Sequence, residues 1–181
     1  MQHDDQVRRF LARHQRRRAQ ANQDGGPGRP FESFGFHNIS TYIASGNVLF
    51  ETAEMDADAV TKRIEEGLTK ALGYEVKVIL RTISQIEDLV SLDPFGGVEP
   101  AENARLYVTF LADEPSSTLK LPYESSNGEL QILRKRDRDL CWLLFLSPTA
   151  RTVDGMAFVE KEFGKASTTR NWHTVQKITA L

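Results

Sequence analysis

The chain has 181 residues, and its 40% hydrophobic and 27% charged composition is that of an ordinary globular protein. A formal net charge of −2 excludes a global positive field that would attract nucleic acid or an acidic membrane. No apolar stretch approaches the roughly 18 residues of a membrane span. The single cysteine, Cys141, lies in an apolar run, so we expect a buried thiol in a cytoplasmic protein.

The first 30 residues differ in composition from the rest of the chain. They are rich in glutamine, glycine and proline, and they hold seven arginines against three aspartates. Few large apolar residues are available there to build a core. We expect residues 2–23 to be disordered or a loosely docked helix, and residues 24–30 to be a loop.

The next segment reads as the first half of an α+β domain. Residues 31–36 look like a helix end that stops at Gly35, the usual residue after a helix. Residues 38–44 and 46–52 are rich in β-branched and aromatic residues and predict a hairpin. Apolar residues at helical spacing predict a helix over 56–72, with Asp56 or Asp58 as its cap. Alternation over 75–82 predicts a further strand.

The second half begins after a short helix over 83–92 and a boundary rich in proline and glycine. A strand is expected over 105–112, followed by a hairpin of 129–135 with 139–146. A helix near 154–163 and a last helix from about Thr168 complete the chain.

Together these elements predict two α+β subdomains with antiparallel sheets, the first of them ferredoxin-like. The first, residues 31–95, lacks its usual first strand. The second covers 96–181 and ends in a helix. Residues 1–30 form a separate basic segment.

The turn Ser45-Gly46-Asn47 has two interpretations. Ser-x-Asn also occurs in penicillin-binding enzymes, but their Ser-x-x-Lys and Lys-Thr-Gly motifs are absent here. The simpler interpretation is a hairpin turn whose side chains satisfy backbone groups. The alternative is a turn that also presents Ser45 and Asn47 to a ligand.

The C-terminal segment "STTRNWHTVQKITAL" offers a possible anion site. If Thr168 caps the last helix, free N–H groups at its start and the adjacent Arg170 could bind an anion. The alternative is a solvated face on a docked helix, with Trp172, Val175 and Ile178 buried.

Other functional patterns are weak. "RLYVTFLA" resembles a signature strand of RNA-recognition domains, but the second aromatic segment is missing, so a buried strand is the better interpretation. The histidines have no ligand-like spacing, and no zinc, P-loop or dinucleotide pattern occurs. We therefore expect no metal, no cofactor and no specific nucleic-acid partner, and no reaction is identified.

"FESFGFHNISTYIASGNVLF" and "STTRNWHTVQKITAL" together resemble the bacterial family of domain of unknown function 1697. The resemblance covers about residues 31–181 and implies two ferredoxin-like subdomains without an established activity. Family members begin with a strand and a loop resembling "FLRGINVGG", which this chain lacks. A one-base shift of the back-translated sequence from Phe10 permits "FLRGINVGG", and the family pattern resumes in frame at Phe31. We hypothesise that residues up to about Pro30 are translated out of frame.

Two functions follow as expectations. The first is binding of a small anionic or nucleotide-like ligand, by a site that combines Ser45, Gly46 and Asn47 with Thr169, Arg170 and Asn171. The second is a non-catalytic module that binds protein or RNA through its sheet faces.

Overall fold

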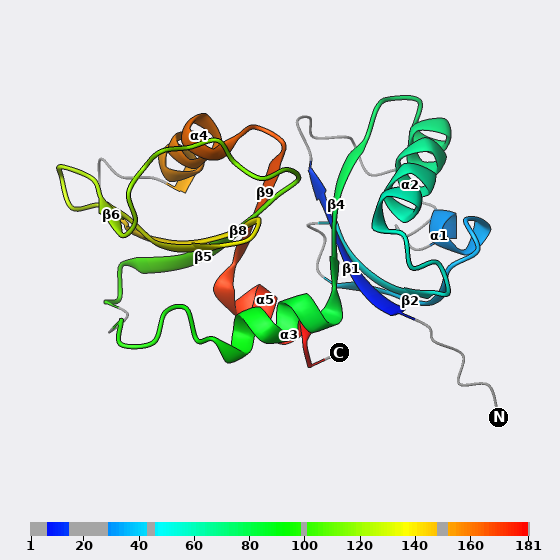
Figure 1. Ribbon diagram of the computed structural model, residues 1–181, viewed down its shortest axis with the longest axis horizontal. Coiled ribbons are helices and arrows are strands. Elements are labelled where there is room, and N and C mark those ends of the chain that lie inside the picture. Colours follow the sequence, from blue (N-terminus) through cyan, green and yellow to red (C-terminus); the bar gives the residue numbers. More distant parts are fainter. Residues whose placement is uncertain (1–6, 15–28, 43–45, 99–100, 148–151, 181) are drawn as a thin grey trace. The chain divides into compact units, whose positions relative to one another are not determined.

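The computed structural model describes residues 7–14, 29–42, 46–98, 101–147 and 152–180 (Figure 1). The chain divides into two compact units, Met1–Gln85 and Ile86–Leu181, and each is described by itself. Both units combine helices with an antiparallel sheet, so the expected α+β class is confirmed.

The first unit follows the succession strand, helix, strand, strand, helix, strand. Its elements are β1 (Val7–His14), α1 (Arg29–Ser33), β2 (His37–Tyr42), β3 (Asn47–Thr52), α2 (Ala57–Leu72) and β4 (Lys77–Thr82). The sheet has the order β2-β3-β1-β4, and every neighbouring pair is antiparallel. The expected hairpin, the helix α2 and the strand β4 are confirmed.

The expectation that this unit lacks its first strand is wrong. Strand β1 lies between β3 and β4, and Leu11 pairs with Val48 on one side and with Leu80 on the other. The basic composition of the segment misled the interpretation, because ladder hydrogen bonds use backbone N–H and C=O groups that any extended segment without proline supplies. Because β1 pairs on both sides, neither β3 nor β4 is left with an unpaired edge at the centre of the sheet.

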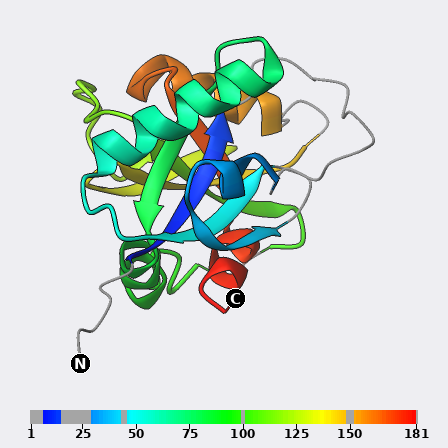
Figure 2. The same cartoon turned by 90° about the vertical axis from the view of Figure 1, so that its right-hand side faces the viewer.

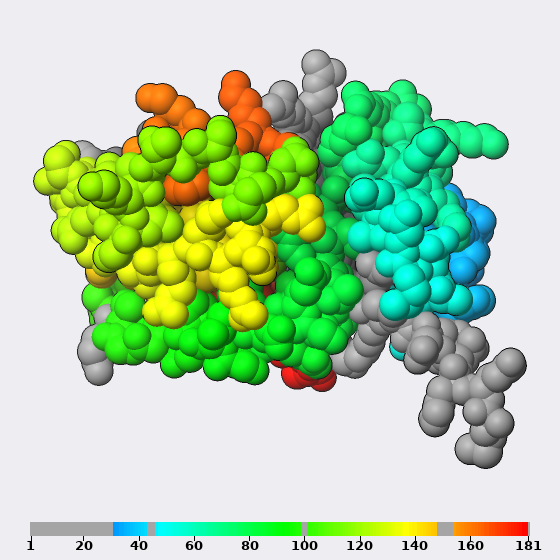
Figure 3. Space-filling model, viewed as in Figure 1, coloured from blue at the N-terminus to red at the C-terminus, as the bar shows by residue number. Residues whose placement is uncertain are grey.

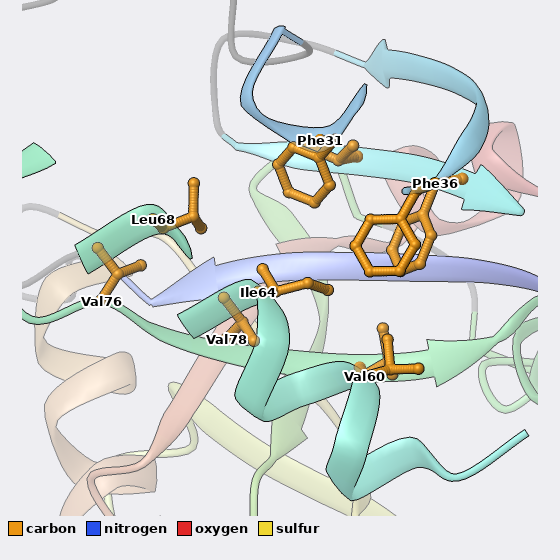
Figure 4. Packing of buried hydrophobic residues seen from close by; sticks show 10 residues of the cluster. Phe31, Phe36, Val60, Ile64, Leu68, Val76 and Val78 are labelled. Carbon is orange, nitrogen blue, oxygen red and sulfur yellow. The ribbon is translucent and has the colours of Figure 1, made fainter. Parts of the chain in front are cut away.

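Helix α2 lies across one face of this sheet (Figure 2). Its buried residues Val60, Ile64 and Leu68 recur every four positions and meet apolar side chains of α1, β3 and β4 (Figure 4). Asp56 caps the helix start, since its side chain accepts from the backbone N–H groups of Asp58 and Ala59. The resulting core is wholly apolar and is centred on Phe50, which is fully buried.

The second unit carries a larger sheet. Its elements are α3 (Ile83–Ser91, which begins just before the unit boundary), β5 (Ala104–Leu111), β6 (Tyr123–Glu124), β7 (Leu130–Arg136), β8 (Asp139–Phe145), α4 (Thr152–Phe163), β9 (Ser167–Asn171) and α5 (Trp172–Ile178). The strand order is β6-β7-β8-β5-β9, again antiparallel. The predicted strand β5, the β7–β8 hairpin and α4 are confirmed; the hairpin region is yellow on the surface in Figure 3.

The core of this unit lies between the sheet and α4. Trp142 is its largest fully buried side chain, and Gly155 of α4 allows the helix to approach the indole ring. A Cβ atom at Gly155 would lie 2.9 Å from Cζ3 of Trp142, closer than such contacts normally come. Cys141, the neighbouring residue on β8, is also buried, as expected. Burial, with a smaller contribution from Asp139, raises the pKa of its thiol to about 12, so the thiol is inert at neutral pH.

The expectation of a last helix from Thr168 is wrong in its starting point. Residues Ser167–Asn171 form strand β9, which pairs with β5 so that Thr169 faces Thr109, and the helix begins only at Trp172. The β-branched threonines favour an extended backbone, and the open edge of β5 supplies the hydrogen-bond partners. The segment with the candidate residues is therefore a strand at the edge of a sheet.

Candidate functional site

The six candidate residues lie in two places, one in each unit. Ser45 lies outside the described residues. Gly46 has a φ of 82°, a backbone conformation that favours glycine, and Asn47 is the first residue of β3. The Asn47 side chain is fully buried, and its Nδ2 donates to the carbonyl oxygen of Tyr42 at 3.2 Å. This bond joins the two ends of the hairpin loop, so the side chain stabilises the turn.

Thr169, Arg170 and Asn171 follow one another along β9. Since side chains alternate across a strand, Arg170 shares one face with Thr168, while Thr169 and Asn171 share the other. Nη1 of the half-buried Arg170 donates to Oγ1 of Thr168 at 2.6 Å and to the carbonyl oxygen of Thr169 at 2.9 Å. These bonds hold the guanidinium against the strand that carries it.

Burial lowers the pKa of Arg170 to about 10, because a guanidinium that is partly removed from water loses solvation of its charge. The side chain is still a cation at neutral pH. Arg170 differs in this from the exposed Lys77, whose pKa is raised by its contact with Glu65. A poorly solvated cation of this kind gains from contact with an anion.

On the other face of β9, Thr169 is joined to the core by hydrogen bonds. Its Oγ1 lies 2.7 Å from Oγ1 of Thr109, and Nε1 of Trp142 donates to the same Thr109 oxygen at 2.9 Å. Thr109 and Trp142 are fully buried, whereas Thr169 is half-buried. Sequence reasoning missed Thr109 and Trp142; the available signal was a single threonine within the apolar strand "YVTFL".

Asn171, not Thr168, caps the last helix. Its Oδ1 accepts from the backbone N–H of His173 at 3.0 Å. Helix α5 has only seven residues, and its buried residues are Trp172, Val175 and Ile178, as expected. The start of this short helix is therefore capped by Asn171, and the expected cap at Thr168 is wrong.

A second cluster of cations lies at the tip of the β7–β8 hairpin, but its charges are largely engaged. Lys135 pairs with Glu114, and Nη2 of Arg136 lies 3.9 Å from Oδ2 of Asp88. Nη1 of Arg138 donates to the carbonyl oxygen of Ala112 at 2.6 Å.

The strand β5 offers no stacking surface for RNA bases. Val108 and Phe110 are fully buried, and Tyr107 stacks on Trp142 with ring centroids 4.5 Å apart. The interpretation of "RLYVTFLA" as a buried strand is confirmed, since base recognition of this type requires exposed aromatic rings.

Among the described residues, no three histidine, cysteine, aspartate or glutamate side chains come together as a metal site would require. Within the same residues, none of the helices has the length and apolar character needed to span a membrane.

Residues 29–140 match the family model described as protein of unknown function (DUF1697). The chain belongs to this family. The structure is similar to that of the conserved bacterial protein SP0830 from Streptococcus pneumoniae, with a TM-score of 0.67 over 97% of each chain and 17% sequence identity. At this identity the likeness shows a shared fold. No protein of curated function matches the sequence.

Proposed function

We propose that this member of the family binds a small anionic ligand through strand β9, with Arg170 as the cation that contacts it. The observation that carries the proposal is the half-buried guanidinium, held in place by Thr168 and by the carbonyl oxygen of Thr169. An arginine fixed in this way needs little further ordering when it binds a phosphate or carboxylate. The proposal retains the expected cytoplasmic location, which rests on the single buried cysteine.

A bound anion and burial shift the pKa of Arg170 in opposite directions. Burial lowers the pKa of Arg170, which means that the charged form is the one that burial penalises. A bound anion stabilises the charged form, so binding offsets that penalty and raises the pKa again. An exposed arginine has no such penalty to offset.

The turn of residues 45–47 is proposed as a separate ligand-binding element of the first unit. Ala12 of β1 pairs with Asn47, so β1 ends at the same end of its sheet as the Gly46 turn. Substitution of Ser45 by alanine tests this part, and we expect weaker ligand binding with an unchanged melting temperature of the free protein.

The out-of-frame origin of residues up to about Pro30 is also a proposal. The family match begins at residue 29, close to Phe31, where the hypothesis has the true frame return. Reading the DNA across this region decides the matter. A shifted frame that does not encode Arg-Gly-Ile-Asn-Val-Gly-Gly would end the hypothesis.

A thermal-shift screen of the full chain tests the ligand proposal. Nucleotides, phosphorylated metabolites and dicarboxylates are the probes, and a ligand present at 100 times its Kd adds about 2.7 kcal/mol of stability. We expect Arg170→Ala to abolish the shift. Arg105→Ala is the matched control, because Arg105 is an exposed arginine on β5 of the same unit whose Nη1 also donates to carbonyl oxygens.

The alternative, a non-catalytic module for protein or RNA, gives a different result in the same screen. It is favoured if only RNA or a protein partner stabilises the chain and Arg170→Ala leaves that effect intact. Equal loss of the small-ligand shift in Arg170→Ala and Arg105→Ala would also contradict the proposal, because it would indicate a general charge effect.

A further inference from the structure

A chain of hydrogen bonds with a fixed direction runs from the core of the second unit to β9. The indole N–H of Trp142 can only donate, so Oγ1 of Thr109 must accept from it. The hydroxyl proton of Thr109 then needs an acceptor, because Thr109 is fully buried. Among the described residues, Oγ1 of Thr169 is the acceptor within reach, at 2.7 Å.

The opposite direction leaves a buried group without a partner. If Thr169 donated to Thr109, the Thr109 oxygen would accept twice and its own proton would point at no acceptor in the described part of the chain. An unsatisfied buried hydroxyl is costly. The direction is therefore Trp142 to Thr109 to Thr169, and the proton of the half-buried Thr169 hydroxyl is left to donate outward.

Asn171 also has a side-chain donor directed outward, but for a different reason. Its Oδ1 is committed to the backbone N–H of His173, which identifies that atom as the amide oxygen. The Nδ2 group, with two protons, therefore remains as the exposed end of the side chain. Thr169 and Asn171 share one face of β9 and lie about 6.6 Å apart along the strand.

We propose that Thr169 and Asn171 form a pair of hydrogen-bond donors that binds the oxygens of a phosphate or carboxylate group. Each acceptor oxygen of the two side chains already accepts one hydrogen bond within the protein, and the protons of both side chains are left to donate to a ligand. The carbonyl oxygen of Thr169 is also occupied, since Nη1 of Arg170 donates to it. The pair selects an oxyanion over a ligand that offers N–H or O–H groups.

This inference rests on the proposed function, but it concerns Thr169 and Asn171 where the proposed function concerns Arg170. Trp142 sets the direction of the chain from the core and does not touch the ligand, so it is a positioning residue. Replacement of Trp142 by phenylalanine frees Thr109 to accept from Thr169, and the Thr169 proton can then turn inward. The proposal thus requires a buried residue to alter affinity at the edge of the sheet.

Nuclear magnetic resonance of the full chain gives a residue-specific measurement. Inorganic phosphate and acetate are titrated in parallel, with methylammonium as the control ion, and the reporters are the side-chain amide of Asn171 and the indole N–H of Trp142. We expect both oxyanions to shift the Asn171 amide protons in a saturable way, and methylammonium to shift neither reporter. The stronger of the two oxyanions identifies the ligand group. Absence of a saturable shift with either oxyanion would overturn the proposal.

Paired variants separate the donor from the shape of the side chain. We expect Thr169→Val to weaken oxyanion binding about fivefold to tenfold, as for the loss of one hydrogen bond, while Thr169→Ser retains it. Asn171→Asp keeps the cap on α5 but replaces the amide donors by a carboxylate, so we expect binding to be lost. We expect Trp142→Phe to weaken oxyanion binding as much as Thr169→Val does. Ile132→Val is the control for a loss of side-chain volume in the core.

The outcomes distinguish the two proposals. If Arg170→Ala abolishes binding while the threonine and asparagine variants bind normally, the proposed function stands and the donor pair is wrong. If those variants weaken binding while Arg170→Ala does not, the donor pair stands and the role of Arg170 is wrong.

Discussion

In each unit a glycine of a helix makes room for an aromatic ring, but the two rings are held differently. In the first unit, a Cβ atom at Gly67 of α2 would overlap the ring of Phe34, which is half-buried just after α1. In the second, Gly155 of α4 meets Trp142, which is fully buried and donates a hydrogen bond to Thr109. The packing of α4 is therefore joined through hydrogen bonds to the candidate residues on β9, whereas the contact of Gly67 on α2 with Phe34 is apolar.

This difference suggests where the molecule tolerates change. A purely apolar contact can rearrange at the cost of packing alone, while a contact that also fixes a hydrogen-bond direction affects the groups at the far end of the chain. Substitutions in the apolar core of the first unit should change its stability only. Substitutions around Trp142 should change both stability and ligand binding.

The largest expected effect comes from a substitution that disrupts the apolar core of the first unit. Phe50→Ala removes a fully buried ring that lies 4.4 Å from Phe36 and 5.9 Å from Phe31 between centroids, and we expect a loss of about 3–5 kcal/mol. Urea unfolding measures it. Phe34→Ala is the control and should cost less, because Phe34 is half-buried.

The thiol of Cys141 reports on the second unit during the same experiment. It is buried there and should react with a thiol reagent only when that unit opens. We expect Phe50→Ala to leave the labelling rate unchanged. A parallel rise in labelling would show that loss of the first core also opens the second, and the comparison of two separate cores would fail.

Regular patterns were the most predictable features of the fold. The spacing of Val60, Ile64 and Leu68 predicts α2, and β5 and the β7–β8 hairpin follow from apolar, β-branched runs. In these segments local preference and the tertiary environment favour the same structure. Asp56 as the cap of α2 follows from the same local rules.

The strands at either end of the chain were not predictable in this way. For β1, the composition of residues 7–14 suggests disorder, but the backbone of β3 and β4 provides partners on both sides. For β9, "STTRN" permits a helix cap or a strand, and the open edge of β5 decides. The hydrogen bonds of Thr109 reach residues 60 and 33 positions away in the sequence, and so the link to β9 appears only in the folded chain.

The next effect in size tests the coupling in the second unit. Gly155→Ala places a Cβ atom 2.9 Å from the Trp142 ring, and overpacking of this kind costs about 1–3 kcal/mol. The better helix propensity of alanine offsets about 1 kcal/mol of that cost. We expect a lower melting temperature together with weaker oxyanion binding. Loss of stability with unchanged binding would show that Trp142 can move without disturbing Thr109.

A smaller loss of stability is expected from substitution of a helix cap. Asp56 accepts from the backbone N–H groups of Asp58 at 2.9 Å and Ala59 at 3.3 Å. Asp56→Ala should cost about 1 kcal/mol in urea unfolding, and Asp56→Asn should cost less, because it keeps an acceptor. Neither variant should affect ligand binding, in contrast to Asn171→Asp, which keeps its cap and is expected to lose the ligand.

The smallest effect is expected at Gly67. Gly67→Ala places a Cβ atom against the ring of Phe34, but that ring is half-buried and can swing outward, because none of its described contacts is a hydrogen bond. Alanine also gains about 1 kcal/mol of helix propensity over glycine, so we expect a change within about 1 kcal/mol of zero. Thermal unfolding of Gly67→Ala beside Gly155→Ala measures the contrast directly. A loss at Gly67 as large as that at Gly155 would mean that hydrogen bonding of the aromatic ring does not determine how firmly a helix is seated on its unit.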